Sequence, residues 1–495
     1  MSEPIATGAA GDHVPTGAAT LRAMLLEQPD RPALLDEAGR VRSRGELVAR
    51  VDRLAGTLAE EGLAGEPVGV WYANSIAAFE AYLAVEWVGA TRLVMDPATA
   101  PAEAEAMLDA AQARFALADR AHAALLRRPA IVHDDDSAPD GRPREPDSAV
   151  PPERPLHLYP RGVRTGELHA VPISYGNWAQ TIALNCRLYR SGAYGAGWRE
   201  HDETLLTLQQ LPHGTALIGS FPFLWMGRPQ VLVERFDPAR VPELIERFAV
   251  TATGMTSGML AALTRSLEDT GAPAAGRLRR LVYGGAPLSL EQMRRAHAAL
   301  GPVLVQVYGR LEGGWPLAIL GQRDHAAILD GEPGLAGSCG RPVGAPVELR
   351  LRPVAGGQEG VGELCTRSAM VVREYADPDG WCALGDLASL DADGCLHLRG
   401  RLDDMINTGY HVYPQQIEEA LTAIPGVAAA RVRGEPDERR GEAIVAYVVP
   451  AAARAGERLG GEALRARLRE TLAPYKIPHR IELVATLPDR APASG

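Results

Sequence analysis

The most informative segment of the sequence is Gly380–Leu421, which reads GWCALGDLASLDADGCLHLRGRLDDMINTGYHVYPQQIEEAL. Asp386 stands in a Gly-Asp turn, and Arg401 follows it at the start of the run RLDD. A carboxylate accepts hydrogen bonds from both hydroxyls of a cis-diol, and a guanidinium offers a planar fork of donors. An aspartate and an arginine at such turns therefore suit a ribose.

This segment closely resembles the hinge region of the adenylate-forming enzymes, the superfamily of acyl-CoA ligases, luciferases and peptide-synthetase adenylation domains. The resemblance implies that Asp386 and Arg401 bind the ribose of a nucleotide. It also implies that Asp403 is the hinge about which a small C-terminal domain turns. The order GYHV at residues 409–412 is more similar to aryl-CoA ligases and luciferases than to peptide-synthetase domains.

Upstream of this segment the sequence alternates between short apolar runs and amphipathic helices. The runs VGVW at residues 68–71 and RLVM at residues 92–95 have the composition of buried strands. Apolar residues then recur at helical spacing between Ser43 and Gly62, and Ser43 followed by Glu46 has the pattern of a capping box. Alternation of strands and helices is typical of a doubly wound α/β sheet.

The domain organisation follows from this alternation and from the resemblance. We expect an α/β fold with a large N-terminal domain at residues 1–400, made of doubly wound sheets plus a β-rich subdomain. A small α+β C-terminal domain at residues 401–495 is expected to join it through the hinge. Residues 133–155, which are rich in Asp, Pro and Ser, are expected to form a flexible loop.

The composition excludes several classes of function. The chain has 495 residues, of which 46% are hydrophobic and 23% charged, as in an ordinary globular protein. A net charge of −11 argues against nucleic acid or an anionic membrane as a partner. No apolar run reaches membrane-spanning length, and five scattered cysteines suit a reducing compartment. We therefore expect a cytoplasmic enzyme.

Two further segments have the pattern of a nucleotide site. Two glycines follow a strand directly and leave bare backbone against which a flat ligand can lie. This run resembles the adenine-binding loop of the family and comprises Gly284, Gly285, Ala286 and Pro287. A second run, YGRLE at residues 308–312, resembles the family motif Y-G-x-T-E.

The second run departs from the family motif at one position. The resemblance implies that Tyr308 and Gly309 contact the adenine and that Glu312 holds Mg²⁺ beside the phosphates. Leu311, however, replaces the threonine whose hydroxyl would meet the α-phosphate.

The acid-binding residues are less well marked. His213 falls where the family places a histidine near the reacting carboxylate, although one histidine in an apolar segment is equally often structural. Met255 and Trp315, together with His213, can wall an apolar pocket for an aryl or medium-chain acid. Met255 and Trp315 are equally good core residues.

The phosphate loop diverges most from the family pattern, which is rich in glycines and hydroxyls and contains a lysine. Residues 159–174 read YPRGVRTGELHAVPIS, with one residue extra, most hydroxyls missing, and His169 in the lysine position. Arg161 and Arg164 are candidates for holding phosphate oxygens, or else are mobile surface arginines. The only lysine in the sequence is Lys476, at a position that the family uses structurally.

The last residues, LPDRAPASG at 487–495, resemble the start of a family motif whose lysine bridges the substrate carboxylate and the α-phosphate. The printed sequence stops where that lysine would come next. The sequence leaves open whether the chain was cut there or lacks the residue.

The resemblance implies an enzyme that uses ATP to activate a carboxylic acid as its acyl-AMP. The acyl group then passes to the thiol of CoA or of a carrier-protein pantetheine, or to an amine. Implied cofactors are ATP/AMP and Mg²⁺, and the partners are a small-molecule carboxylic acid and, alternatively to CoA, a carrier protein. Two alternatives stay open: a homologue that acts on a preformed adenylate or acyl thioester without ATP cleavage, and a non-catalytic nucleotide-binding homologue.

Overall fold

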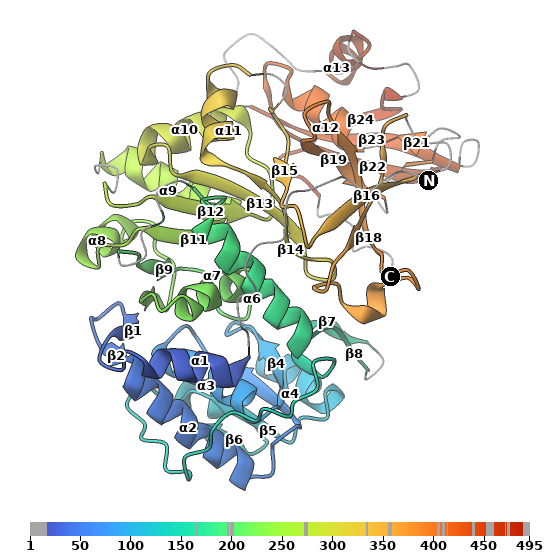
Figure 1. Cartoon of the computed structure of the whole chain (residues 1–495). Helices are drawn as coiled ribbons and strands as arrows, with labels where there is room; N and C mark the ends of the chain where they lie inside the picture. The colour runs from blue at the N-terminus through green and yellow to red at the C-terminus, as the bar shows by residue number, and fades with distance from the viewer. Residues whose placement is uncertain are drawn as a thin grey trace. The chain divides into compact units, whose positions relative to one another are not determined.

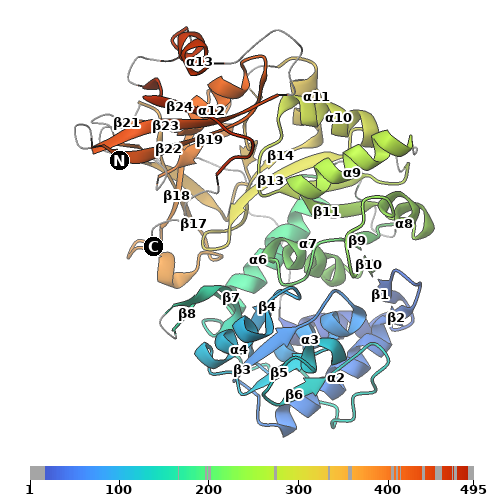
Figure 2. The same cartoon turned by 180° about the vertical axis from the view of Figure 1, so that it is seen from behind.

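The structure is a computed structural model of the chain. It describes residues 17–164, 167–195, 198, 202–271, 276–332, 335–354, 359–402, 406–407, 411–412, 414–437, 441–451, 460–470, 472 and 476–488. Contacts divide the chain into two compact units, drawn from two sides in Figures 1 and 2. The larger unit comprises Ala6–Glu348 and Arg367–Cys382, and the smaller unit comprises Met1–Ile5, Leu349–Thr366 and Ala383–Gly495.

The first sheet of the larger unit has nine strands in the order β15-β14-β13-β12-β11-β9-β10-β1-β2. Neighbours from β13 to β1 are parallel, whereas β2, β14 and β15 pair antiparallel to their neighbours. The strands are β1 (Pro32–Asp36), β2 (Val41–Ser43), β9 (Leu205–Thr207), β10 (Gln230–Leu232), β11 (Ala252–Thr256), β12 (Arg280–Gly284), β13 (Leu304–Arg310), β14 (Gly314–Leu320) and β15 (Arg341–Pro342).

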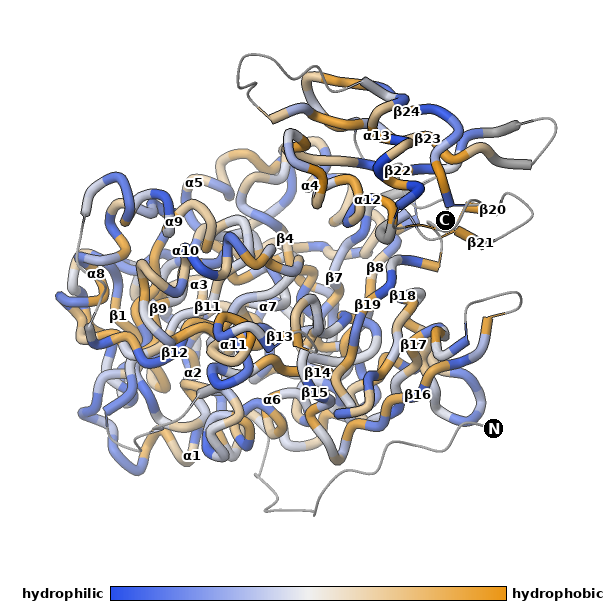
Figure 3. Tube along the Cα trace, turned by 90° about the horizontal axis from the view of Figure 1, so that it is seen from above, coloured by the Kyte–Doolittle hydropathy of each residue, from blue (hydrophilic) through white to orange (hydrophobic). Residues whose placement is uncertain are grey.

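The core of this sheet lies against helices that follow its strands. One buried cluster joins residues of β9, β10, β12 and β13 with residues of α8 to α11, and hydrophobic stretches run through this part of the trace (Figure 3). Parallel strands need such crossover helices to connect them. The helices of this region are α6 (Tyr175–Arg190), α7 (Gly214–Trp225), α8 (Val241–Arg247), α9 (Ser257–Thr270), α10 (Leu290–Leu300) and α11 (Gln322–Leu329).

The second sheet of the larger unit has six strands in the order β6-β5-β3-β4-β7-β8. All neighbours are parallel except β7 and β8, which form an antiparallel hairpin. Its strands are β3 (Pro67–Trp71), β4 (Thr91–Met95), β5 (Phe115–Ala118), β6 (Ala130–Val132), β7 (Pro155–Arg164) and β8 (Glu167–Ser174). Its helices are α1 (Ala18–Leu26), α2 (Arg44–Glu60), α3 (Ile76–Trp87), α4 (Pro101–Ala110) and α5 (Arg120–Ala123).

Local sequence signals explain where the elements of the larger unit begin. The predicted capping box at α2 is confirmed, because the Ser43 hydroxyl accepts from the Glu46 backbone N–H at 3.2 Å and the Glu46 carboxylate accepts from the Ser43 backbone N–H at 2.9 Å. The predicted strands at residues 68–71 and 92–95 lie within β3 and β4. The predicted doubly wound α/β class is likewise confirmed.

The smaller unit is β-rich and then α+β. Its first sheet has the antiparallel pair β18–β19 at one end, and a separate three-stranded sheet follows in the order β22-β23-β24. The elements are β16 (Glu348–Pro353), β17 (Gly362–Arg367), β18 (Cys382–Leu390), β19 (Leu396–Arg401), β20 (Ile406–Asn407), β21 (His411–Val412), α12 (Pro414–Thr422), β22 (Val427–Asp437), β23 (Gly441–Pro450), α13 (Gly461–Leu468) and β24 (Arg480–Leu483). A single-turn 3₁₀ helix, η1 (Arg373–Tyr375), belongs to the larger unit.

Helix α12 begins at the predicted proline, Pro414, and buries Ile417 and Leu421 on one face. The domain boundary at residue 400 and the hinge at Asp403 stay predictions, and Asp403 lies outside the described residues. Within the described part of the chain, no helix is both long and apolar enough to cross a bilayer.

Residues 133–155 contain no helix or strand up to the start of β7, and buried charges tie the beginning of this segment to α3. Glu80 on α3 is fully buried, and its carboxylate accepts from His133 at 2.7 Å and from Arg50 at 2.7 Å. Arg42 adds a third ion pair at 3.1 Å. The predicted flexibility of residues 133–155 stays a prediction.

The Glu80 cluster has a consequence for stability. Burial alone would raise the pKa of Glu80, but the hydrogen bonds from His133 and Arg50 outweigh it and lower that pKa. A carboxylate whose pKa is lower in the folded state stabilises the fold above its unfolded pKa. That contribution is lost as the pH falls through the folded-state value.

We therefore expect Glu80→Gln to lower the free energy of unfolding by about 3 kcal/mol at pH 7, because it leaves the buried His133 and the half-buried guanidinium groups of Arg42 and Arg50 without their carboxylate. Urea denaturation measures this loss, and the difference from the unmodified protein should shrink below about pH 4. The exposed Glu61→Gln is the matched control. Equal stability of the two variants would contradict a structural role for the cluster.

Candidate functional site

The segment that resembles a phosphate loop folds as the antiparallel hairpin of β7 and β8. The register shifts between Pro160 and Gly162, so that the extra residue, Arg161, is accommodated as a β-bulge. The guanidinium of Arg161 forms an ion pair with the carboxylate of Glu312. His169 lies opposite Gly162 on β8 and is exposed. The inserted residue thus places a guanidinium beside Glu312, the glutamate of the motif that resembles Y-G-x-T-E.

The carboxylate of Glu312 faces two guanidinium groups. Arg161 pairs with one oxygen, and Arg310 Nε lies 3.9 Å from the other. Magnesium in nucleotide sites is commonly held by one or two carboxylates plus substrate phosphates, so the carboxylate of Glu312 has the chemistry to hold this ion. The phosphate role of Arg161 stays a prediction. Among the described residues, no group of three His, Cys, Asp or Glu is placed to hold a metal on its own. Arg164 ends β7, and its side chain lies outside the described part of the chain.

His213 pairs with Asp96, and the residue after it, Gly214, lies against Leu311 of the motif that contains Glu312. His213 is the N-cap residue of α7, its side chain is exposed, and its Nε2 lies 3.2 Å from the Asp96 carboxylate at the end of β4. A Cβ added to Gly214 would lie 3.3 Å from Leu311 Cδ1 and 3.8 Å from the Tyr159 ring. The start of α7, the first residues of the hairpin and the motif containing Glu312 therefore meet at one place.

In the predicted adenine loop, the space next to Gly285 is open, whereas the space next to Gly284 is occupied. Gly285 has φ +93° and nothing within 4 Å of an added Cβ, and Ala286 and Pro287 are exposed. A Cβ on Gly284, in contrast, would lie 2.9 Å from Val307 O and 3.2 Å from the Trp315 indole. The bare backbone of Gly284 is therefore occupied by the protein itself.

Ser257 contacts the backbone of this loop, and the sequence analysis did not predict it as a site residue. Ser257, the first residue of α9, donates from its hydroxyl to Ala286 O at 2.5 Å and to Gly284 O at 3.3 Å. The only sequence signal for it is a Thr-Ser pair between a strand and an amphipathic helix. Asp96 was not predicted as the partner of His213, because the two residues are far apart in the sequence.

Three further predicted residues of the larger unit, Tyr308, Gly309 and Met255, lie on strands of the nine-stranded sheet. Tyr308 is half-buried on β13 and pairs in register with Ala318 of β14, and Gly309 follows it. Met255 on β11 is buried in the hydrophobic cluster under α8 to α11. Its role in an acid pocket stays a prediction.

Asp386 and Arg401 form a cross-strand pair in the smaller unit. They face each other in the register of β18 and β19, with Arg401 Nη1 3.0 Å from the Asp386 carboxylate. The same nitrogen donates to Leu384 O at 3.0 Å. Gly385, just before Asp386 in β18, has φ +67°, and a Cβ added there would lie 3.0 Å from Arg401 Nη2, so glycine leaves room for the guanidinium. The predicted Gly-Asp turn is therefore a strand position with one left-handed residue. The pair presents a carboxylate and a guanidinium side by side, and its role in binding a ribose stays a prediction.

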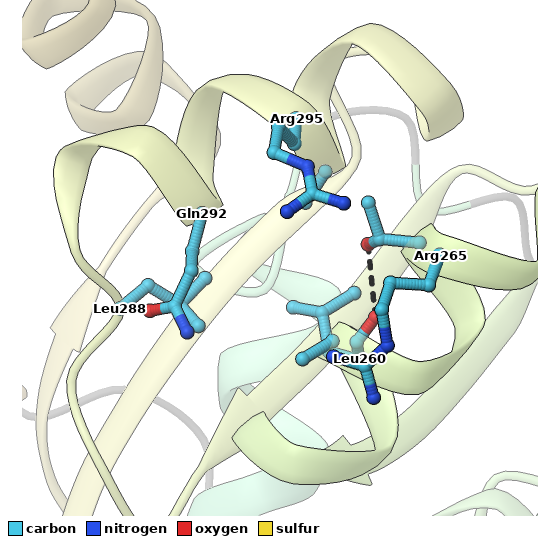
Figure 4. A pocket seen from close by; sticks show the side chains of 8 residues that line it. Leu260, Arg265, Leu288, Gln292 and Arg295 are labelled. Carbon is cyan, nitrogen blue, oxygen red and sulfur yellow. Dashed lines mark hydrogen bonds between the residues drawn. The ribbon is translucent and has the colours of Figure 1, made fainter. Parts of the chain in front are cut away.

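A separate hollow lies between α9 and α10 in the larger unit (Figure 4). It holds about 50 Å³, which is room for a water molecule or two rather than a nucleotide. None of the predicted site residues lines it. Its lining consists of Leu260, Ala261, Thr264, Arg265, Leu288, Gln292, Arg295 and Ala296.

Comparison with known proteins identifies the family. The family model described as "AMP-binding enzyme" matches residues 21–376, and the model described as "AMP-binding enzyme C-terminal domain" matches residues 416–492. The chain belongs to the AMP-binding enzyme family. The predicted resemblance to adenylate-forming enzymes is thereby confirmed.

Individual relatives agree with this assignment. A feruloyl-CoA synthase of Amycolatopsis sp is 32% identical over 475 residues, which cover 91% of this chain and 90% of that protein. The medium/long-chain-fatty-acid–CoA ligase FadD8 of Mycobacterium tuberculosis is 30% identical, and the match covers 68% of this chain but 59% of that longer protein. The solved structure of the amide bond synthetase McbA from Marinactinospora thermotolerans is 28% identical with a TM-score of 0.78, covering 95% of this chain and 96% of that one.

For this AMP-binding enzyme, Ser257→Ala is expected to weaken AMP binding about fivefold. The change removes a hydroxyl that orders two carbonyls of the predicted adenine loop, and such a hydrogen bond contributes about 1 kcal/mol. Isothermal titration calorimetry measures the affinity. Ser266→Ala on the same helix is the matched control, and an equal effect in both variants would contradict a role for Ser257 in the loop.

The ribose prediction has its own test. Asp386→Asn is expected to lower the affinity for AMP about tenfold while changing that for 2′,3′-dideoxy-AMP less than about twofold, because the dideoxy ligand has no diol for the carboxylate to accept from. Asp393→Asn, exposed on the turn of the same hairpin, is the control. An equal loss for both ligands would mean that Asp386 only holds Arg401 in place.

Proposed function

We propose that this AMP-binding enzyme activates an aryl or medium-chain carboxylic acid with ATP. An oxygen of the acid attacks the α-phosphorus, the bond to the β-phosphate oxygen breaks, and pyrophosphate leaves. The product is an acyl-AMP, a mixed anhydride. In a second step a thiol or an amine attacks the acyl carbon, loses its proton, and displaces AMP.

The observation that supports this proposal is that, in a chain of this family, Arg161 pairs with Glu312 and Gly214, the residue after His213, lies against Leu311 of the same motif. Arg161 can neutralise phosphate charge where the family uses hydroxyls and a lysine, since a guanidinium binds phosphate through paired donors. Where a magnesium ion accompanies the nucleotide, Glu312 is the carboxylate that would hold it.

His213 is proposed to contact the reacting carboxylate. Its imidazole is exposed at the start of α7, and Asp96 lies 3.2 Å from its Nε2. A carboxylate partner orients an imidazole, so that His213 would meet the incoming acid in a fixed position.

The proposed role of the smaller unit is to hold the ribose through Asp386 and Arg401 and to turn about Asp403 between the two steps. The acceptor is proposed to be CoA or a carrier-protein pantetheine, or an amine. Relatives named as CoA ligases support the thiol, and the relative named as an amide bond synthetase supports the amine.

A second candidate activity is transfer from a preformed adenylate or acyl thioester without ATP cleavage. It is favoured by the two guanidinium groups that face Glu312 and compete with a metal ion, and by the apolar Leu311 in place of a hydroxyl. A non-catalytic nucleotide-binding role is the remaining alternative.

ATP–pyrophosphate exchange with a panel of aryl and fatty acids separates these activities. We expect acid-dependent exchange, and we expect Arg161→Ala to raise the KM for ATP about tenfold while changing the affinity for AMP less than about twofold, because AMP lacks the phosphates that Arg161 would bind. The exposed Arg190→Ala on α6 is the control.

Two outcomes would contradict the proposal. Bound AMP without exchange for any acid would favour the ATP-independent activity. Faster exchange in Arg161→Ala would mean that Arg161 only blocks Glu312 and does not bind phosphate.

A further inference from the structure

Trp315 lies at the edge of the nine-stranded sheet where the parallel strands end. It is the second residue of β14, which turns back from β13. Gly284 is the last residue of β12, and Gly309 is the next-to-last residue of β13. Ligands of open α/β sheets bind in the crevice beyond the carboxyl ends of such strands. Trp315 is therefore placed in the region where ligands of such a sheet bind.

The indole of Trp315 packs on the bare backbone of both glycines. A Cβ added to Gly309 would lie 2.5 Å from Trp315 Cε3 and 3.0 Å from Cδ2, and a Cβ added to Gly284 would lie 3.2 Å from Cη2. One six-membered ring thus spans the ends of two neighbouring strands. The two glycines leave a flat space, and a side chain of the protein fills it.

The backbone that carries this ring is fixed by helix α6. The side-chain amide of Asn185 donates to Trp315 O at 3.2 Å and to Thr181 O at 2.8 Å. Its oxygen accepts from the Tyr194 hydroxyl at 2.5 Å, and Asn185 is itself buried. Next to the ring, Met370 packs against Gly314, where an added Cβ would lie 2.9 Å from Met370 Cβ. A shift of β14 that made room for a longer ligand would break the contacts of Asn185 and Met370 with this strand.

We propose that Trp315 closes the inner end of the acyl pocket and restricts this enzyme, among the aryl and medium-chain acids of the proposed function, to compact ones such as a single aromatic ring. The inference rests on the proposed function, because it concerns the acid that is activated. The ring is half-buried, so that its outer part remains as the floor on which the compact acid lies. An extended acid would have to occupy the space that the indole fills.

Stable acyl-adenylate analogues test the proposal by binding alone. We expect benzoyl-sulfamoyl adenosine to bind the unmodified enzyme at least about tenfold more tightly than dodecanoyl-sulfamoyl adenosine, a discrimination of the size that pocket shape supplies. Trp315→Gly should abolish or reverse this preference. Trp315→Phe, which keeps an aromatic ring in the same space, should retain most of it, and melting temperatures establish that each variant is folded.

The outcomes separate a failure of the proposed function from a failure of the inference about Trp315. Binding of neither analogue by any folded variant would overturn the proposed function and this inference with it. Binding of both analogues with equal affinity before and after Trp315→Gly would overturn the inference and leave the proposed function standing. If Trp315→Gly does not fold, an unchanged preference in the smaller step Trp315→Leu would overturn the inference as well.

Discussion

The parallel pairing of β11, β12 and β13 is the constraint on which the candidate site depends. Parallel strands end at the same edge of a sheet, so the turns that follow them are brought together whatever their distance in sequence. Ser257 begins the helix after β11, Gly284 ends β12, and Glu312 follows β13. A hydroxyl, the open backbone of Gly285 next to Gly284, and a carboxylate thus share one edge because of the hydrogen-bond register of three strands.

The glycines at this edge serve two different purposes. Gly285 takes a positive φ and remains open, as a position for a ligand requires. Gly284 and Gly309 are needed because the indole of Trp315 lies against them, and a side chain at either position would clash with it. A glycine pair read as ligand-binding from its sequence is in this chain partly a packing site for tryptophan.

The electrostatics of the site depend on a single inserted residue. The β-bulge at Arg161 turns an extra residue of the hairpin into a guanidinium that reaches Glu312. Arginine offers a planar fork of donors where a lysine would offer a compact charge, so it can pair with a carboxylate or with a phosphate in the same geometry. The loss of hydroxyls and of a lysine from the loop is therefore accompanied by a specific gain of positive charge.

The sequence alone determined the α/β class, the family, and the position of elements such as α2 and α12, because capping residues, proline at a helix start and hydrophobic periodicity act within a few residues of one another. It also named Asp386 and Arg401 as candidate ribose ligands, whereas their pairing with each other follows from the register of β18 and β19. Only the tertiary structure decided that Ser257 holds the loop, that Asp96 faces His213, and that Trp315 covers Gly284 and Gly309. These contacts join segments that are distant in the chain, and their geometry is set by strand register and packing that no local pattern encodes.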